Sequence, residues 1–284
     1  MGARALVAAA AALLMMVAAV AMEDATPDNI QPLSTLKMQA ARVAMDSAAV
    51  IHASPAVLGE NGEDSAWVAV NFTAPAPSAG HWVALFSPAD FGLSVGGSVS
   101  ASAAAAAAGE GGPTAGLQTA PIKYMFANAS PSFMSSGSGN MSFLLINQRS
   151  DYAFGLFSGG KDNPKLIAVS NKISFANPKA PVFPRLAQGK EWNEMAVTWT
   201  SGYNINEACP FVEWRMKGEE NSKRTPAGTL TYTRRQLCGK PANAEGYRDP
   251  GFIHTAFLKD LWPNREYDET SSTEYDRTQR TFPW

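Results

Sequence analysis

The chain has 284 residues and a mass of 30.2 kDa, which is enough for two domains at most. Lys and Arg number 23 against 25 for Asp and Glu, and this balance argues against a nucleic-acid-binding protein, which needs a basic face. Two cysteines and three histidines exclude a disulfide-dense scaffold and a four-cysteine zinc site, and they leave few ligands for any metal centre. The 23 glycines, 19 prolines and 10% aromatic residues favour a β-rich fold with many turns.

Residues 1–21 have the pattern of a secretory signal peptide. Arg4 precedes an unbroken apolar run over Ala5–Val20, and Ala19-Val20-Ala21 fits the small-residue rule for cleavage. The run is rich in alanine and no basic cluster follows it, so the pattern disfavours a membrane anchor. We therefore expect a secreted protein without a membrane partner.

The chain contains three Asn-x-Ser/Thr sequences, which are relevant to glycosylation if the protein is secreted. They begin at Asn71, Asn128 and Asn140, and each is a candidate site of N-glycosylation. Pro131 directly follows the Asn128 sequence and makes it the weakest of the three. Asn71 and Asn140 fall in strand-like stretches, so their side chains must face solvent if they carry glycans.

Residues 22–47 carry a weak helical rhythm, with Leu33, Leu36, Val43 and Ala44 at helical spacing. Such a stripe is typical of packing against another element. The pattern predicts a leader segment that lies on the first domain.

From Ile51 onward the apolar period changes to two residues, as in strands. Apolar side chains share one face in Trp67–Phe72 and again in Tyr152–Phe157. The strands expected in this region are Val50–Ala53, Trp67–Phe72, Trp82–Ser87, Ile122–Ala127, Met141–Asn147, Tyr152–Phe157 and Leu166–Phe175. About seven short strands separated by turn signals predict an antiparallel sandwich over residues 48–178. An Ala/Gly-rich stretch, residues 92–120, is expected to be a mobile surface insert.

A proline-marked linker, Asn177–Pro181, leads to a second series of strands over residues 179–267. The expected strands are Arg185–Gly189, Met195–Thr200, Phe211–Met216, Gly228–Thr233 and Phe252–Leu258. Trp199 and Trp214 occupy inward positions, where large aromatic side chains usually form core. The mixed charges of 217–224 indicate a solvated hairpin tip.

The stretch Leu261–Tyr267 follows the last of these strands. Its Leu-x-Pro-x-x-x-Tyr pattern is typical of the corner between the fifth and sixth strands of a fibronectin-type sandwich, which a tyrosine closes by a hydrogen bond to the backbone. No apolar alternation continues over residues 268–284. We therefore expect a disordered tail there and a second sandwich that stops after five strands.

Many segments, in chain order from about residue 50 to Tyr267, resemble the large plant purple acid phosphatases. Three resemble the first β-domain of that family: Ala120–Tyr124, Leu145–Asp151 and Ala153–Gly160. Ser174–Val182 resembles the junction to the second domain. Further segments are similar to the second domain itself: Arg185–Ala187, Gly189–Trp192, Val197–Tyr203, Pro210–Trp214, Cys238–Gly239, Arg248–Thr255 and Leu261–Asn264. The resemblance implies an all-β fold of two consecutive fibronectin type III-like or immunoglobulin-like sandwiches, of which the second is expected to be incomplete because the alternation stops at Tyr267. It also implies a location outside the cell, in the cell wall or in the vacuole.

The resemblance also implies a family function, the metal-dependent hydrolysis of phosphate monoesters or anhydrides. The activity of the family resides in a separate metallophosphatase domain that binds Fe(III) together with Zn, Mn or Fe(II). Its ligands lie in Asp-x-Gly, Gly-Asp-x-x-Tyr, Gly-Asn-His-Glu, Val-x-x-His and Gly-His-x-His, and the sequence does not contain this set. No catalytic, cofactor-binding or metal-binding residue is therefore carried over, and no cofactor is expected in this chain.

The remaining candidate residues have simple structural interpretations. His52, His81 and His254 fall on three separate strands in two domains, which does not suit a metal centre. His254 is expected to be a hydrogen-bonded structural histidine, and Asp249 is expected to order the turn that follows it. Cys209 and Cys238 either form a disulfide in the secretory lumen or stay unpaired.

Two functional hypotheses stay open. In the first, the chain is the non-catalytic N-terminal half of a purple acid phosphatase family protein, with the catalytic metallophosphatase domain as its partner, and homodimer formation is left open. In the second, it is a secreted β-sandwich module that binds a protein or a cell-wall glycan through exposed aromatic residues such as Trp82, Trp192 and Trp262.

Overall fold

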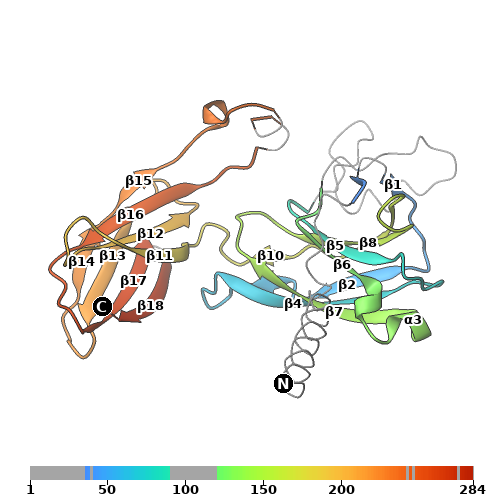
Figure 1. Cartoon of the computed structure of the whole chain (residues 1–284), viewed down its shortest axis with the longest axis horizontal. Coiled ribbons are helices and arrows are strands. Elements are labelled where there is room, and N and C mark those ends of the chain that lie inside the picture. The colour runs from blue at the N-terminus through green and yellow to red at the C-terminus, as the bar shows by residue number, and fades with distance from the viewer. Residues whose placement is uncertain are drawn as a thin grey trace, which may run out of the picture.

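The computed structural model describes residues 36–38, 41–89, 120–240, 243–244, 247–273 and 276–283. These residues form two β-sandwiches placed end to end (Figure 1). The expected signal peptide, the leader before Leu36 and the expected insert up to residue 119 lie outside the described residues. Among the described helices, none is long and apolar enough to cross a lipid bilayer.

The first sandwich consists of a five-stranded and a three-stranded sheet. The larger sheet has the order β1 (Arg42–Val43), β9 (Lys165–Val169), β8 (Ala153–Ser158), β5 (Trp82–Phe86), β6 (Lys123–Phe126). The smaller sheet has the order β2 (Val50–Ser54), β4 (Ser65–Thr73), β7 (Ser138–Ile146). A short parallel pair, β3 (Val57–Leu58) with β10 (Ser174–Phe175), and two short helices, η3 (Ala127–Ala129) and α3 (Phe133–Ser136), complete the domain.

Period-two alternation builds the core between these two sheets. Val68, Val70 and Phe72 on β4 are all at most 2% exposed, as their spacing predicts. Their cluster also contains Phe143 and Phe154, whose ring centroids lie 4.9 Å apart on opposite sheets. The expected last strand of this domain is instead divided into β9 and β10 by residues 170–173.

Strand β5 is buried on both of its faces, which the sequence reading did not anticipate. Trp82 was expected to be an exposed aromatic, and this expectation is wrong, because its exposed fraction is 0%. Its ring stacks on Phe157 with a centroid distance of 4.1 Å, and its Nε1 donates to the Gly160 carbonyl at 3.2 Å. Leu36 and Ala41 of the leader belong to the same buried cluster, so the leader covers the outer face of the larger sheet.

Of the described leader residues, only Met38 has a helical conformation, that of a 3-10 turn. Arg42 and Val43 form β1, which pairs in parallel with Lys165 and Leu166 of β9. The helical spacing was therefore misleading in this part, although the leader does lie on the first domain as expected.

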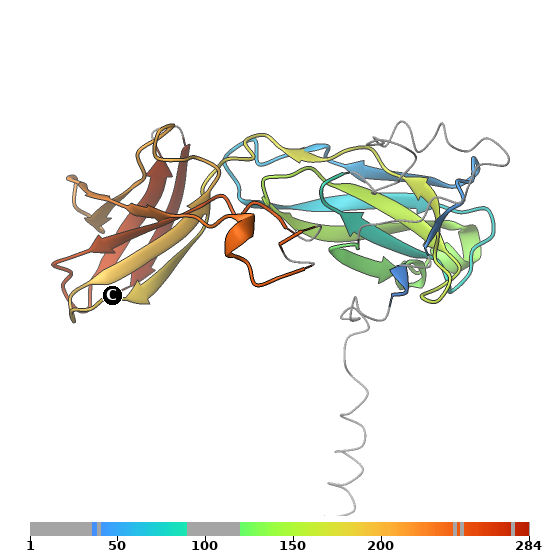
Figure 2. The ribbon, with the colours of Figure 1, turned by 90° about the horizontal axis from the view of Figure 1, so that it is seen from above.

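The second sandwich consists of two four-stranded sheets. One has the order β11 (Val182–Gln188), β12 (Met195–Ser201), β16 (Phe252–Leu258), β15 (Gly228–Leu230). The other has the order β14 (Lys223–Pro226), β13 (Phe211–Met216), β17 (Glu266–Thr273), β18 (Asp276–Pro283). Trp199 and Trp214 are 1% and 5% exposed in the core between them, as expected. The chain from β15 to β16 makes a long excursion that includes the short helix η4 (Arg234–Gln236) (Figure 2).

The expectation of a disordered tail and an incomplete second sandwich is wrong. Residues 266–273 and 276–283 form β17 and β18, and β17 pairs with β13 over six residue pairs from Phe211↔Ser272 to Met216↔Tyr267. Strand β18 is an edge strand, and edge strands keep polar and charged residues instead of an apolar alternation. Strand β17 lies between β13 and β18 and is held by backbone hydrogen bonds on both sides, which require no apolar alternation. A search for apolar periodicity does not detect strands that are held mainly by backbone hydrogen bonds. The expected hairpin tip at 217–224 also contains the start of a strand, β14.

The tyrosine corner predicted at Tyr267 is present. The backbone N–H of Trp262 donates to the Tyr267 hydroxyl oxygen at 2.8 Å, and Tyr267 is 2% exposed. The first sandwich has a similar device, because the Tyr152 hydroxyl donates to the carbonyl of Ile146. Burial raises the pKa of Tyr152 to about 12, so the hydroxyl keeps its proton for this bond.

Candidate functional site at the junction of the two domains

The three histidines lie in three unrelated surroundings. His52 is exposed on β2, and His81 lies just before β5, where its Nδ1 meets the Ser78 hydroxyl at 2.9 Å. His254 on β16 is 0% exposed, and both of its ring nitrogens are occupied, by the hydroxyls of Ser201 at 2.8 Å and Thr229 at 2.9 Å.

These surroundings do not fit the Fe(III) and divalent metal pair of the phosphatase family. A two-metal site needs several nitrogen and oxygen ligands that converge on ions a few ångströms apart. Within the described residues, no group of three or more His, Cys, Asp or Glu side chains could hold a metal ion.

The candidate modification sites are all at the surface. Asn71 on β4 and Asn140 on β7 are exposed cross-strand neighbours, and the Asn140 side-chain amide donates to the Asn71 side-chain oxygen at 2.6 Å. Asn128 is exposed in η3. Cys209 and Cys238 are exposed free thiols, so the structure does not contain the disulfide that was one of the two alternatives for them.

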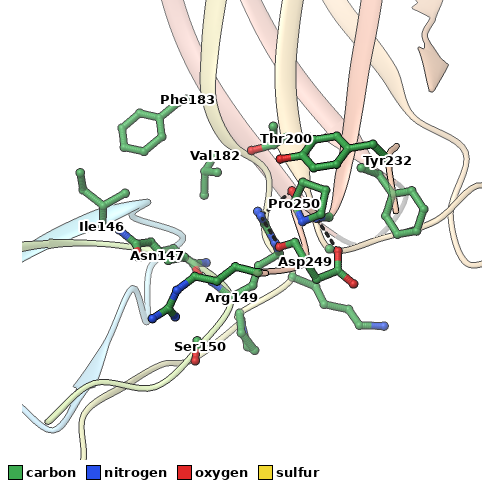
Figure 3. Close-up of a pocket in the computed structure, with 17 residues that line it drawn as sticks. Ile146, Asn147, Arg149, Ser150, Val182, Phe183, Thr200, Tyr232, Asp249 and Pro250 are labelled. Atoms are coloured by element: carbon green, nitrogen blue, oxygen red, sulfur yellow. Dashed lines mark hydrogen bonds between the residues drawn. The ribbon is translucent and has the colours of Figure 1, made fainter. Parts of the chain in front are cut away.

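A cavity of about 900 Å³ lies where the two sandwiches meet. Residues of the first domain and residues of the second domain face one another across it (Figure 3). The first domain contributes Ile146, Asn147, Gln148, Arg149 and Ser150, and the excursion before β16 contributes Tyr232, Arg248, Asp249 and Pro250.

Arg149 is the main polar link between the domains. Its Nη2 donates to the backbone carbonyls of Pro250 and Asp249, which lie about a hundred residues later in the chain. The side chain is half-buried, and burial lowers the pKa of its guanidinium while the charge of Asp249 opposes that shift. An arginine remains charged under such conditions, so these are charge-assisted hydrogen bonds.

Two features of the backbone place Arg149 and its acceptors. Arg149 itself has a φ of 60°, and its N–H donates to the Asn147 side-chain oxygen at 3.0 Å. On the other side, Gly251 has a φ of 68°, and its N–H donates to the Asp249 carboxylate at 2.7 Å, which confirms the expected turn. A Cβ at residue 251 would lie 2.8 Å from Nε of Arg149 and 2.4 Å from the Ser201 carbonyl oxygen, so only glycine lets the guanidinium lie against this turn.

The linker between the domains adds a second set of contacts. Asn177 receives a hydrogen bond from Asn147 of the first domain on its backbone carbonyl, and its side-chain amide donates to the Tyr203 hydroxyl of the second domain, both at 3.0 Å. The backbone N–H of Phe183 donates to the Asp64 carboxylate at 3.3 Å. Because three separate segments bridge the domains, the junction restrains their relative orientation.

The charges of the cavity are mostly engaged within the protein. Arg149 is bonded to backbone carbonyls, and the Lys179 ammonium pairs with Glu207 at 2.5 Å. The Asp249 carboxylate receives the Gly251 N–H. These groups are therefore better suited to holding the two domains together than to binding an anionic ligand.

The sequence predicts the linker of this junction, Asn177–Pro181, but not the contacts that Arg149 makes across it. In the sequence, Arg149 is only one residue of Leu145–Asp151, a stretch that resembles the purple acid phosphatases. A single arginine after a strand gives no signal that separates an arginine with buried partners from one that faces solvent. The Asp249-Pro250-Gly251 turn gave the one available signal, since a glycine after a proline indicates a backbone position with special geometry.

Replacement of Arg149 by alanine is expected to loosen the junction without unfolding either sandwich. The variant should show a larger maximum dimension in small-angle X-ray scattering and faster proteolysis at 177–181, because the charge-assisted bonds to the second domain are lost. Gly251→Ala should have the same effect, since a Cβ there collides with the guanidinium. Arg185→Ala, an exposed arginine on β11, is the matched control. Scattering and proteolysis unchanged in both junction variants would contradict the assignment.

Comparisons with known proteins agree on one family for both domains. The family described as "Fn3-like domain from Purple Acid Phosphatase" matches residues 51–177, and the family described as "Purple acid Phosphatase, N-terminal domain" matches residues 181–276. The second match includes all of β17 and ends at the first residue of β18.

Individual relatives show the same similarity. The chain is 54% identical over 237 residues to "Probable inactive purple acid phosphatase 27" and 50% identical over 238 residues to "Probable inactive purple acid phosphatase 1", both of Arabidopsis thaliana. In each case the similarity covers 84% of this chain and 37% of the relative, so the chain spans about a third of the length of these relatives. The structure of purple acid phosphatase PPD1 from yellow lupin (Lupinus luteus) seeds matches with a TM-score of 0.65 and 50% identity, over 83% of this chain and 40% of that one.

Proposed function

Because the chain belongs to the purple acid phosphatase family and carries its N-terminal domains, we propose that it acts as a rigid, non-catalytic two-domain unit of that family. The observation that carries this proposal is the junction, where Arg149 of the first sandwich binds the backbone of Asp249 and Pro250 in the second. Such a junction fixes the orientation of the two domains, so that binding surfaces on both of them keep a constant position relative to each other.

The surroundings of the histidines support a non-catalytic role. His254 is enclosed and hydrogen-bonded on both ring nitrogens, and His52 and His81 lie in the other domain. The two Arabidopsis relatives carry the words "probable inactive" in their names. We propose that in a longer protein of this family the unit would precede the metallophosphatase domain, which would be its partner.

We further propose that the protein is secreted and glycosylated, with the cell wall or the vacuole as destinations. The exposure of Asn71, Asn128 and Asn140 supports this, since an N-glycan requires a solvent-facing asparagine. Asn71 and Asn140 are cross-strand neighbours whose side chains share a hydrogen bond, so two glycans there would compete for the same space.

The purified chain is expected not to hydrolyse p-nitrophenyl phosphate above the blank between pH 4 and pH 8, with or without added Fe³⁺ and Zn²⁺. The same metals without the protein, and the protein treated with a chelator, are the controls. Metal-dependent turnover that follows the protein through purification would overturn the non-catalytic assignment, whatever the behaviour of the junction.

A further inference from the structure

Two strongly exposed tryptophans of the described residues lie at the far end of the second sandwich. Trp192, in the loop between β11 and β12, is 68% exposed, and Trp262, in the loop between β16 and β17, is 65% exposed. The junction with the first domain is at the opposite end, where Val182 pairs with Thr200 and Ser201 pairs with Phe252. The tryptophans therefore lie away from the first domain.

The two loops run side by side. Met195 of β12 pairs with Leu258 of β16, and beyond this pair the N–H of Leu261 donates to the Asn193 carbonyl at 3.0 Å. This bond joins the turn at residues 191–194, which the N–H of Glu194 closes on the Glu191 carbonyl, to the loop after β16. Trp192 directly precedes the acceptor Asn193, and Trp262 directly follows the donor Leu261, so both tryptophans lie next to the point where the two loops are joined. Leu261 is 1% exposed and anchors this loop in the core, whereas the Trp262 side chain is at the surface.

Buried polar groups hold both loops in place. The Glu194 side chain is 8% exposed, and its carboxylate accepts the N–H of Lys190 at 2.8 Å and that of Glu191 at 3.3 Å. On the other loop, the N–H of Trp262 is fixed by the buried hydroxyl of Tyr267. Each indole thus projects from a backbone that is already ordered, which lowers the entropic cost of binding.

The chemistry of the surrounding surface selects the class of ligand. The loops carry three basic and three acidic residues, so they favour neither an anion nor a cation. Glu194 is buried and lies 3.8 Å from the Lys259 ammonium, and the other four, Lys190, Arg265, Glu191 and Asp260, are exposed. Asn193 and Asn264 supply hydrogen-bonding groups next to the indoles. Large aromatic rings in a neutral, polar setting suit a ligand with apolar C–H faces and hydroxyl edges, which is the chemistry of a pyranose ring.

We propose that Trp192 and Trp262 form a binding platform for a neutral polysaccharide, with each indole stacked on the C–H face of a sugar ring. This platform is independent of the role proposed for the junction. It would let the two-domain unit attach to a neutral glycan through the end that lies away from the first sandwich.

Affinity electrophoresis of the full chain in gels that contain xyloglucan, mixed-linkage β-glucan or galactomannan tests the proposal, followed by calorimetry with the polysaccharide that retards the chain. At least one of the three should retard the wild type. Trp192→Ala and Trp262→Ala should each weaken binding about tenfold or more, as for a central aromatic contact in an interface. Trp67→Ala, which removes a tryptophan that is 64% exposed on the first sandwich, should leave binding unchanged.

Three outcomes would overturn the proposal. The first is that none of the three polysaccharides retards the wild type. The second is that Trp67→Ala weakens binding as much as the other two variants. The third is that sedimentation shows self-association that depends on Trp192 and Trp262, which would make this surface a protein interface. Unchanged thermal unfolding of both variants, together with binding retained by Trp262→Phe, would attribute the loss to the missing ring and support the proposal.

Discussion

Replacement of Trp82 by alanine is expected to destabilise the first sandwich by about 3–5 kcal/mol, the largest effect of any substitution considered for this protein. Trp82 is 0% exposed, its ring stacks on Phe157 at 4.1 Å and meets Tyr124 edge-on at 5.9 Å, and its Nε1 donates to Gly160. Truncation leaves a cavity between β5 and the leader and removes the donor for a backbone carbonyl.

Denaturant unfolding followed by circular dichroism measures this effect. Because domains are held by only about 5–15 kcal/mol, the variant should lose a large part of the cooperative transition of the first sandwich. Trp67→Ala is the matched control, since Trp67 is 64% exposed and its removal should change stability by no more than about 0.5 kcal/mol. Equal, small losses of unfolding free energy in both variants would mean that Trp82 is not central to the buried cluster between the larger sheet and the leader.

Acid is expected to destabilise the second sandwich through His254. Burial lowers the pKa of His254 from 6.5 to about 4, because the ring is enclosed next to Trp199 and has only hydroxyl partners. The unfolded chain then binds more protons than the folded chain between these two pH values. The stabilisation is therefore fully present above pH 6.5 and is lost as the pH falls towards 4, and its total is on the order of 3 kcal/mol.

The unfolding free energy at several pH values between 7 and 4, compared with that of His254→Gln, isolates this contribution. The glutamine variant should be less stable at pH 7, and its stability should fall less steeply towards pH 4 because the titrating ring is gone. His52→Gln, which changes an exposed histidine of the other domain, should leave the pH dependence as it is in the wild type. Parallel pH profiles for wild type and His254→Gln would show that His254 has no such role.

The strands that could be predicted are those with one buried face. In β4 and β12 the buried residues, such as Val68, Val70, Val197 and Trp199, alternate with more exposed ones, and this is the pattern that periodicity detects. The tyrosine corner was predictable for a different reason, because its hydrogen bond depends on a fixed local spacing.

What could not be predicted depends on partners that are distant in sequence. Trp82 is buried in a cluster that includes Leu36 and Ala41 of the leader, and nothing in the local sequence of β5 indicates that these residues join it. Strand β18 forms by backbone pairing with β17, without an apolar pattern of its own. Arg149 finds its acceptors about a hundred residues away, so only the folded chain shows its role.

The central claim is that the two sandwiches form one rigid unit, and residual dipolar couplings of backbone amides test it most directly. If the junction holds, couplings from both sandwiches will fit a single alignment tensor with the orientation seen in Figure 1, and Arg149→Ala will require two tensors. If the wild type already requires two tensors of different magnitude, the sandwiches move independently and the claim of a rigid unit is wrong.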